Sequence, residues 1–183
     1  AYSEGNDVVV VVSAQGHTTD DLIAKAMEIN KHASKREMDV LLSSGEQISM
    51  SLLAMAIESM GFPVISLLGW QAGFHTCLNY GIEKINPDRI KKELDKKNIV
   101  IIAGFQGINE CMDVTTMGRG GSDTSAVAIA AVMNADICKI YTDVEGVYTC
   151  DPRIVKNAKK IYSIDYDEML ELSTLGAQVL NNR

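Results

Sequence analysis

Residues 8–30 read VVVVVSAQGHTTDDLIAKAMEIN, and this order of side chains predicts the fold class. Five consecutive valines at 8–12 are typical of a strand covered on both faces, so we expect a central strand of a parallel sheet. The residues after it predict a loop, a cap at Thr19 or Asp20, and a helix with one apolar side. That side comprises Leu22, Ile23, Ala26 and Met27. A strand followed directly by a helix indicates an α/β fold.

The same alternation continues along the chain. Further helices are expected at 46–60, 86–98, 122–134 and 166–173, and further strands at 62–69, 99–105 and 137–144. Residues 70–85 and 105–117 are less regular, and we expect a hairpin or loops there. Strands that alternate with helices predict an α/β/α sandwich with a mostly parallel central sheet. The length of 183 residues favours a single domain over residues 1–183.

The composition excludes several classes of protein. A net charge of −7 and a pI near 4.9 supply no basic face for a nucleic-acid backbone, so we expect no nucleic-acid partner. The longest apolar run, residues 8–12, is too short to cross a bilayer, so no membrane association is expected. Four cysteines without a C-x-x-C pair fit a reducing cytosol and a cytoplasmic protein. The three histidines, at 17, 32 and 75, lack ligand spacing, so no protein-held metal is expected.

A glycine cluster precedes one of the predicted helices, in MGRGGSDTSAVAIAAVMN at 117–134. Gly120 and Gly121 allow the backbone to approach a ligand, and Ser122 with Asp123 begins the helix, so amide groups converge on one spot that favours an anion. Arg119 could grip a carboxylate there in bidentate fashion. The alternative is an ordinary glycine turn, with Ser122 as N-cap and Arg119 in solvent.

A second polar stretch, IYTDVEGVYTCDPR at 140–153, follows the next predicted strand. Thr142 and Asp143 would occupy the carboxyl end of that strand, where ligands bind in open α/β sheets. Asp143 could accept from a ribose or adenine group, and Tyr148 could contact the base. Asp151 and Arg153 could border the phosphates. The alternative for Asp151 is a turn residue before Pro152.

Two further loops carry polar side chains next to predicted elements. Ser13 begins the exit from the first strand, and Thr19 offers a hydroxyl at the following helix start. The spacing of a Walker P-loop is absent. Glu46, in LLSSGEQ at 41–47, is placed at another helix start, where it could bind a substrate ammonium or complement the helix dipole.

Six motifs together resemble the aspartokinase branch of the amino acid kinase family over nearly the whole chain. They are VSAQGHTTD, LLSSGEQ, GWQAG, AGFQG, TTMGRGGSDTSA and IYTDVEGVYTCDPRIV. The resemblance implies an ATP-dependent kinase, with Mg²⁺ carried by the nucleotide, that converts L-aspartate to 4-phospho-L-aspartate in lysine, threonine and methionine biosynthesis. It also implies a homo-oligomer.

The resemblance assigns roles to individual residues. Thr19, Glu46, Arg119 and Ser122 match the aspartate contacts, with Glu46 near the amino group and Arg119 on a carboxylate. Asp123 matches a catalytic acid that orients lysines. The predicted nucleotide-binding residues are Ser13, Gly120, Gly121, Thr142, Asp143, Tyr148, Asp151 and Arg153.

The chain also departs from the family pattern. Family members open with a strand and a Lys-Phe-Gly-Gly loop, and some carry a lysine where this chain has Gln178. Family members also continue into ACT regulatory domains beyond the position of Arg183. We therefore expect a catalytic-domain fragment, truncated at both ends, that is nearly inactive alone. Two alternatives are another amino acid kinase, acting on a different carboxylate, a carbamate or a nucleoside monophosphate, and a non-catalytic nucleotide-binding or assembly module.

Overall fold

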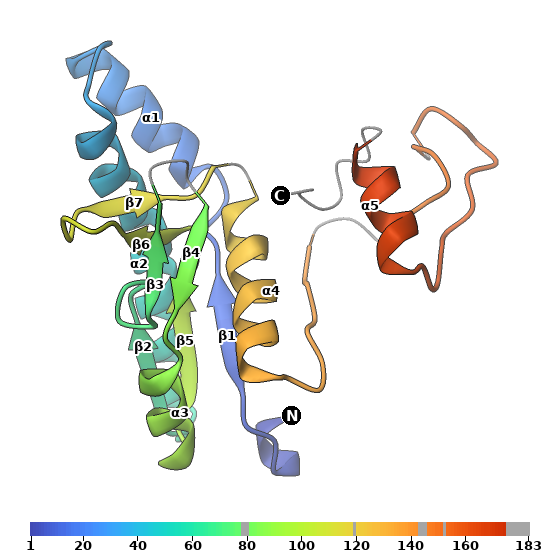
Figure 1. Ribbon diagram of the computed structural model, residues 1–183, viewed down its shortest axis with the longest axis horizontal. Coiled ribbons are helices and arrows are strands. Elements are labelled where there is room, and N and C mark those ends of the chain that lie inside the picture. Colours follow the sequence, from blue (N-terminus) through green and yellow to red (C-terminus); the bar gives the residue numbers. More distant parts are fainter. Residues whose placement is uncertain (78–80, 119, 143–145, 152, 175–183) are drawn as a thin grey trace. The chain divides into compact units, whose positions relative to one another are not determined.

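The structure is a computed structural model that describes residues 1–77, 81–118, 120–142, 146–151 and 153–174 (Figure 1). Two compact units are present, Ala1–Cys138 and Lys139–Arg183. All the named strands and most of the named helices belong to the first unit. The prediction of a single catalytic domain over residues 1–183 stays a prediction.

The first unit contains a short 3-10 helix, seven strands and four α-helices among its described residues. The strands are β1 (Val9–Val12), β2 (Val64–Leu67), β3 (Phe74–Thr76), β4 (Ile82–Ile85), β5 (Ile99–Ala103), β6 (Gln106–Ile108) and β7 (Val114–Thr116). The helices are η1 (Tyr2–Glu4), α1 (Thr18–Ile29), α2 (Lys35–Ser59), α3 (Asp88–Asp95) and α4 (Gly121–Met133).

Strands β1, β5 and β2 form a parallel sheet in that order. Every residue of β5 is buried, whereas β1 is half-buried at the edge of the described sheet. The expectation that residues 8–12 form a central strand was therefore wrong, and β5 is central. An apolar run indicates only that both faces of a strand are covered. It does not distinguish a central strand from an edge strand that is covered on both faces.

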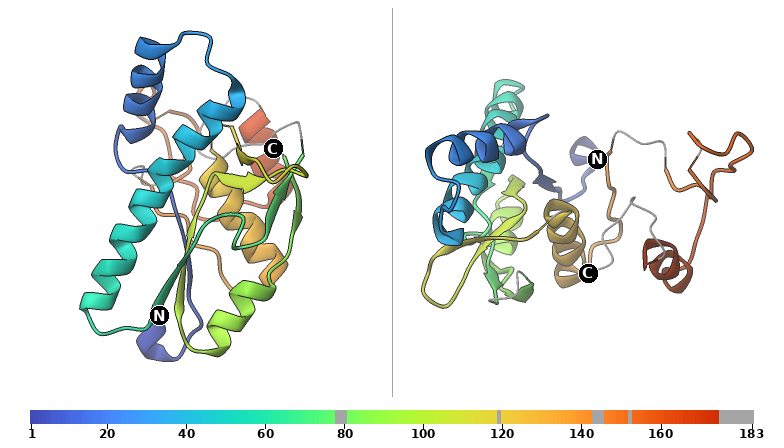
Figure 2. Two further views of the ribbon diagram at one scale, coloured as in Figure 1. Left: turned by 90° about the vertical axis from the view of Figure 1, so that its left-hand side faces the viewer. Right: turned by 90° about the horizontal axis from the view of Figure 1, so that it is seen from above.

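Helices lie on both faces of this sheet, as the apolar packing and Figure 2 show. Val100 and Ile102 of β5 pack in a cluster with Ile90 of α3 and Ile129 of α4. The alternate β5 residues, Ile101 and Ala103, pack in a second cluster with Met50 of α2. Successive side chains of a strand point to opposite faces, so the sheet is the middle of three layers. The predicted α/β/α sandwich with a parallel sheet is confirmed.

A second sheet has the strand order β4-β3-β6-β7 and mixed directions. The pairs β3–β4 and β6–β7 are antiparallel, whereas β3 and β6 run parallel. These two hairpins occupy the segments 70–85 and 105–117, as the irregular patterns predicted. The β6–β7 hairpin carries the chain from the end of β5 toward the glycine cluster before α4.

Helix α2 begins eleven residues before the predicted start at Glu46. Its N-cap is Ser34, whose side chain accepts a hydrogen bond from the Glu37 amide. The serines before Glu46 lie inside the helix, where Ser43 and Ser44 donate their hydroxyls to backbone carbonyls of the preceding turn. The reading of Glu46 as a residue at a helix start was therefore wrong.

One side of α2 is buried against the sheets and the other is exposed. Its buried residues are Asp39, Ser43, Gly45, Glu46, Ser49 and Met50. Three apolar side chains, Ile48, Leu52 and Met55, lie on the exposed side, with Met55 63% exposed. By length and composition alone, α2 could cross a membrane. Its contacts with α1, β1, β2, β5 and β7 place it instead in a layer of the sandwich.

The predicted side-chain caps of α1 and α4 are absent. The N-cap of α1 is His17, without a side-chain cap bond, rather than Thr19 or Asp20. The N-cap of α4 is Gly120 in the left-handed region at φ 75°, rather than Ser122. Glycine adopts this conformation without steric cost, which explains why the helix begins one residue earlier than expected.

The second unit contains α5 (Tyr166–Thr174), which confirms the helix predicted at 166–173. Asp165 and Glu168 exchange side-chain-to-backbone hydrogen bonds across its first turn, which is a capping box. The strand predicted at 137–144 is absent from the described part, 137–142, where Tyr141 is 89% exposed. Its apolar pattern was read as burial, but these side chains do not lie in a sheet.

Candidate active site

The carboxyl ends of β1 and β5 meet the start of α4. The Gly104 amide, directly after β5, donates to the Val12 carbonyl at 3.0 Å. A Cβ on Gly104 would lie 2.9 Å from the Ser122 Cβ, so only glycine allows α4 to begin this close to the strand ends. Ser13, which follows β1, and Ser122 therefore share one edge of the sheet, where open α/β sheets bind ligands.

Helix α2 brings a carboxylate to the same edge. Gly45 permits the approach, because a Cβ there would lie 2.9 Å from the Ala14 Cβ. The Ala14 amide donates to Glu46 Oε1 at 3.1 Å. Glu46 lies in the middle of α2, so the helix-dipole reading was wrong and the ammonium-binding reading remains.

The Glu46 carboxylate is buried and only partly satisfied. Its side chain is 4% exposed, and Oε2 has no hydrogen-bond partner among the described residues. Burial raises the pKa of Glu46, and the backbone amides that bond to the carboxylate only partly offset this rise. A buried carboxylate oxygen without a donor is costly, so the site favours a cationic or hydrogen-bond-donating ligand.

The glycine cluster is fixed against the residue that follows Gly104. Ser125, fully buried in α4, accepts from the Phe105 amide at 3.1 Å and donates to the Gly121 carbonyl at 2.7 Å. A Cβ on Gly121 would lie 2.8 Å from the Phe105 ring, so glycine is required there also. The N-terminus of α4, with its amide groups, is thereby held at the sheet edge. Arg119 lies outside the described residues.

The first unit contains residues of the predicted amino acid site, Thr19, Glu46 and Ser122, together with Ser13, Gly120 and Gly121 of the predicted nucleotide site and the predicted catalytic acid Asp123. Gly120, Gly121 and Ser122 begin α4, and Asp123 is half-buried in the same turn. Thr19 is half-buried in the first turn of α1. The neighbouring Thr18 has its Cγ2 3.6 Å from the position of a Cβ on Gly45, so this turn lies against α2 beside Glu46.

The other predicted nucleotide-binding residues belong to the second unit. Thr142 is exposed, and Tyr148 forms an isolated antiparallel bridge with Lys160. Asp143 lies outside the described residues. The prediction that this segment faces the glycine cluster stays a prediction.

Asp151 and Arg153 form an exposed ion pair at 2.9 Å. The side-chain hydrogen bond from Arg153 is the main cause of a lowered pKa at Asp151 and a raised pKa at Arg153. The Ile154 and Val155 amides donate to the Asp151 carbonyl, so a turn begins at Asp151. The turn interpretation is confirmed for the local structure, and a phosphate contact stays a prediction.

Sequence reasoning missed several residues that build the site. Gln106 is buried and donates its side-chain amide to the Ser43 carbonyl of α2 at 3.0 Å. Asp39, on the preceding turn of α2, accepts from Thr116 of β7. Neither role had a local signal, because each partner is more than sixty positions away in the chain.

The comparisons with known proteins agree with this arrangement. A family model for the amino acid kinase family matches residues 1–183. The chain belongs to the amino acid kinase family. This kinase-family chain is 58% identical to the aspartokinase of Geobacillus stearothermophilus over 98% of its own length and 45% of that protein. The resemblance to aspartokinases is therefore confirmed, and the chain spans less than half the length of these curated relatives.

Solved structures give the same result. Aspartate kinase from Synechocystis superposes on this amino acid kinase family member with a TM-score of 0.84 at 50% identity, over 98% of this chain and 30% of that one. E. coli aspartokinase III in complex with aspartate and ADP superposes with a TM-score of 0.73 at 28% identity, over 91% of this chain and 38% of that one.

Proposed function

We propose that the chain provides the amino acid site of an aspartate kinase. The enzyme transfers a phosphoryl group from ATP to the side-chain carboxylate of L-aspartate and forms 4-phospho-L-aspartate, the first step of lysine, threonine and methionine biosynthesis. One observation carries the proposal: Glu46 Oε2 is buried and unpartnered among the described residues, at the edge of the sheet where α4 begins.

The ammonium and carboxylate groups of an amino acid fit the buried Glu46 carboxylate and the start of α4, respectively. The ammonium group of aspartate binds Glu46, because a buried carboxylate gains most from a cationic donor. A carboxylate of the substrate binds Arg119, Ser122 and the amides at the start of α4. Thr19 lines the substrate from the first turn of α1.

The nucleotide adds the second half of the site. Ser13, Gly120 and Gly121 approach the phosphates, and the segment 142–153 binds the nucleoside. Mg²⁺ arrives on the phosphate oxygens as part of the substrate, a mode that needs no dedicated cage of protein ligands. Phosphoryl transfer depends mainly on positioning and charge, so Asp123 contributes by orienting neighbouring groups rather than by bond formation. That E. coli aspartokinase III was solved with aspartate and ADP supports this pair of substrates.

The test is titration calorimetry of the 183-residue chain with L-aspartate and with succinate, which keeps both carboxylates but lacks the ammonium. L-Aspartate is expected to bind, and succinate is expected to bind at least about tenfold more weakly, because it leaves Glu46 unpaired. Equal affinity for both would overturn the assignment of Glu46. A preference for a nucleoside monophosphate or a carbamate would favour another kinase of the family.

Turnover is tested separately from binding. ADP release with L-aspartate as acceptor is expected from the full-length protein that carries this chain. The expectation that the 183-residue chain alone is nearly inactive stays a prediction, and the same assay on that chain tests it. Nucleotide binding without any phosphoryl transfer by the full-length protein would favour a non-catalytic module.

We also propose that the protein is a cytoplasmic homo-oligomer that associates through α2. Ile48, Leu52 and Met55 form an exposed apolar stripe, and α2 carries no charged residue between Glu46 and Glu58. An uncharged stripe can face its own copy across a twofold axis without like-charge repulsion. Light scattering during size-exclusion chromatography is expected to give a multiple of the chain mass, and Leu52→Asp is expected to give monomers. A monomeric parent chain would contradict this.

A further inference from the structure

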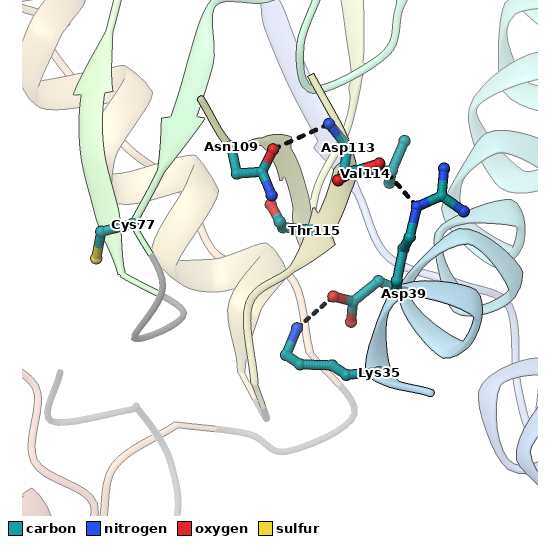
Figure 3. A pocket seen from close by; sticks show the side chains of 8 residues that line it. Lys35, Asp39, Cys77, Asn109, Asp113, Val114 and Thr115 are labelled. Carbon is teal, nitrogen blue, oxygen red and sulfur yellow. Dashed lines mark hydrogen bonds and ion pairs between the residues drawn. The ribbon is translucent and has the colours of Figure 1, made fainter. Parts of the chain in front are cut away.

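Asp39 is a buried carboxylate on α2 that the proposed chemistry does not use. Its side chain faces the second sheet and is 5% exposed. Thr116, the last residue of β7, donates its hydroxyl to Asp39 Oδ1 at 2.6 Å, and Lys35 pairs with the other oxygen. Asp39 and Lys35 line a cavity of about 140 Å³ together with Asn109, Asp113 and Thr115 of the hairpin, and Figure 3 shows these side chains.

The β6–β7 hairpin depends on α2 for its position. Strand β7 is the last in its sheet among the described strands and pairs only with β6. Arg36 donates to Asp113 at 2.8 Å, just before β7, and Asp39 accepts from Thr116 at its end. Both ends of β7 are therefore tied by charged side chains to the first two turns of α2.

Thr116, which donates the hydrogen bond to Asp39, lies directly before the glycine cluster in the chain. Met117 follows it, and the Met117 amide donates to the Phe105 carbonyl at 2.7 Å. Gly118 comes next in the chain, and α4 begins at Gly121. Only one buried residue, Met117, separates Thr116 from the glycine cluster, which we assign to the substrate carboxylate. A change in the position of Thr116 would therefore also move this cluster.

The same helix carries the group assigned to the substrate ammonium. Glu46 follows Asp39 by seven residues, which is about two turns of an α-helix. Between them, the Ser43 carbonyl accepts from Gln106, so α2 is also joined to β6. The relative position of Glu46 and the glycine cluster is thus set by α2 through its bonds to this hairpin.

We propose that Asp39 is a positioning residue for the amino acid substrate, acting through Thr116 and Met117 on the start of α4 at Gly121 and Ser122. This inference rests on the proposed function. It identifies Asp39 as the residue that aligns the two substrate-binding groups, Glu46 and the start of α4. A buried carboxylate costs free energy that an apolar side chain would not, which points to a role in geometry rather than in stability.

The test compares four variants of the 183-residue chain by calorimetry with L-aspartate. Thr116→Val removes the hydroxyl at constant shape, and Asp39→Ala removes the acceptor. Each is expected to weaken L-aspartate binding about tenfold, the scale of one lost hydrogen bond to a charged group. The double variant is expected to lose no more than either single variant, because both changes break the same bond. Asp39→Asn keeps an acceptor for Thr116 and is expected to retain most of the affinity.

Glu93 supplies a matched control on α3, away from the site. It is 3% exposed, pairs with Lys96 at 3.2 Å, and accepts from Asn98 at 3.0 Å. Glu93→Ala removes a buried, paired carboxylate just as Asp39→Ala does. It is expected to lower the melting temperature without changing L-aspartate affinity.

The outcomes separate this proposal from the proposed function. If the parent chain binds no L-aspartate, the proposed function fails first. If the parent binds L-aspartate and Thr116→Val binds it equally well, the positioning role is overturned. The positioning role is also overturned if Glu93→Ala weakens L-aspartate binding as much as Asp39→Ala does, since the effect would then follow stability alone.

Discussion

The backbone amide of Ala14 donates to Glu46 Oε1 at 3.1 Å, which joins the loop after β1 to the middle of α2. The bond fixes one carboxylate oxygen and leaves Oε2 without a partner among the described residues. Glu46 is therefore oriented by the fold while one of its oxygens stays available to a ligand. That combination distinguishes it from Glu93, a buried carboxylate whose oxygens both have partners.

Glu46→Gln is expected to weaken L-aspartate binding by a factor on the order of 100, because an ammonium then faces a neutral amide in a buried site. The melting temperature is expected to stay equal or rise, because a neutral group is easier to bury. Calorimetry and thermal unfolding measure the two effects. ATP affinity serves as the internal control, and an unchanged affinity for L-aspartate contradicts the role of Glu46.

The pH dependence follows from the raised pKa of Glu46. Its folded pKa lies above the ordinary glutamate value of 4.5, so the folded state holds this proton more tightly than the unfolded state does. The stabilising contribution of this proton is fully present below 4.5 and is lost as the pH rises through the folded pKa. L-Aspartate binding needs the charged form, so affinity is expected to fall as the pH drops into the same window.

This pH effect is checked by titration calorimetry across that window with the parent chain and with Glu46→Gln. The variant is expected to lack the part of the pH profile that belongs to Glu46. Identical profiles would show that another group titrates.

Gly45→Ala is expected to weaken L-aspartate binding and to destabilise the fold. Alanine is favoured over glycine inside a helix by about 1 kcal/mol, so helix propensity alone predicts the opposite sign. The added Cβ would lie 2.9 Å from the Ala14 Cβ, and such overpacking typically costs about 1–3 kcal/mol. Urea unfolding measures the difference. A more stable variant with unchanged affinity would mean that α2 has room to move.

Ser125→Ala is expected to lower the free energy of unfolding by about 1–3 kcal/mol, because the buried Phe105 amide loses its acceptor. Ser59→Ala is the control, since Ser59 makes the same kind of hydroxyl-to-carbonyl bond in a helix but is exposed. The control is expected to change stability by less than about 0.5 kcal/mol. Equal effects of the two substitutions would contradict the role of Ser125 as an anchor.

The layers of the fold could be predicted from local patterns. Helix α3 and strand β5 lie within the segments 86–98 and 99–105, where a helix and a strand were expected. The start of α2 at Lys35 was missed, because the polar residues Ser43 and Ser44 lie inside the helix and donate their hydroxyls to carbonyls of its preceding turn. The strand expected at 137–144 is absent from the described part, 137–142, because an apolar pattern does not by itself show that the segment pairs with another strand.

The candidate site was predictable in part. Polar residues after strands and before helices identified Ser13, Gly120, Gly121 and Ser122, and the structure brings them to one edge of the sheet. The tether from Asp39 to Thr116 joins residues 77 positions apart, so no local pattern carries it. The roles of Gly45 and Gly104 could not be predicted for the same reason. Each glycine allows a close approach to a residue far away in the chain, where a Cβ atom would clash.

The central claim is that Glu46 binds the ammonium group of an amino acid substrate. A crystal structure of the chain soaked with L-aspartate tests it most directly. The account predicts the substrate nitrogen within about 3 Å of Glu46 Oε2, with a carboxylate directed at the start of α4. L-Aspartate bound with its nitrogen turned away from Glu46, or bound at another surface, would contradict it.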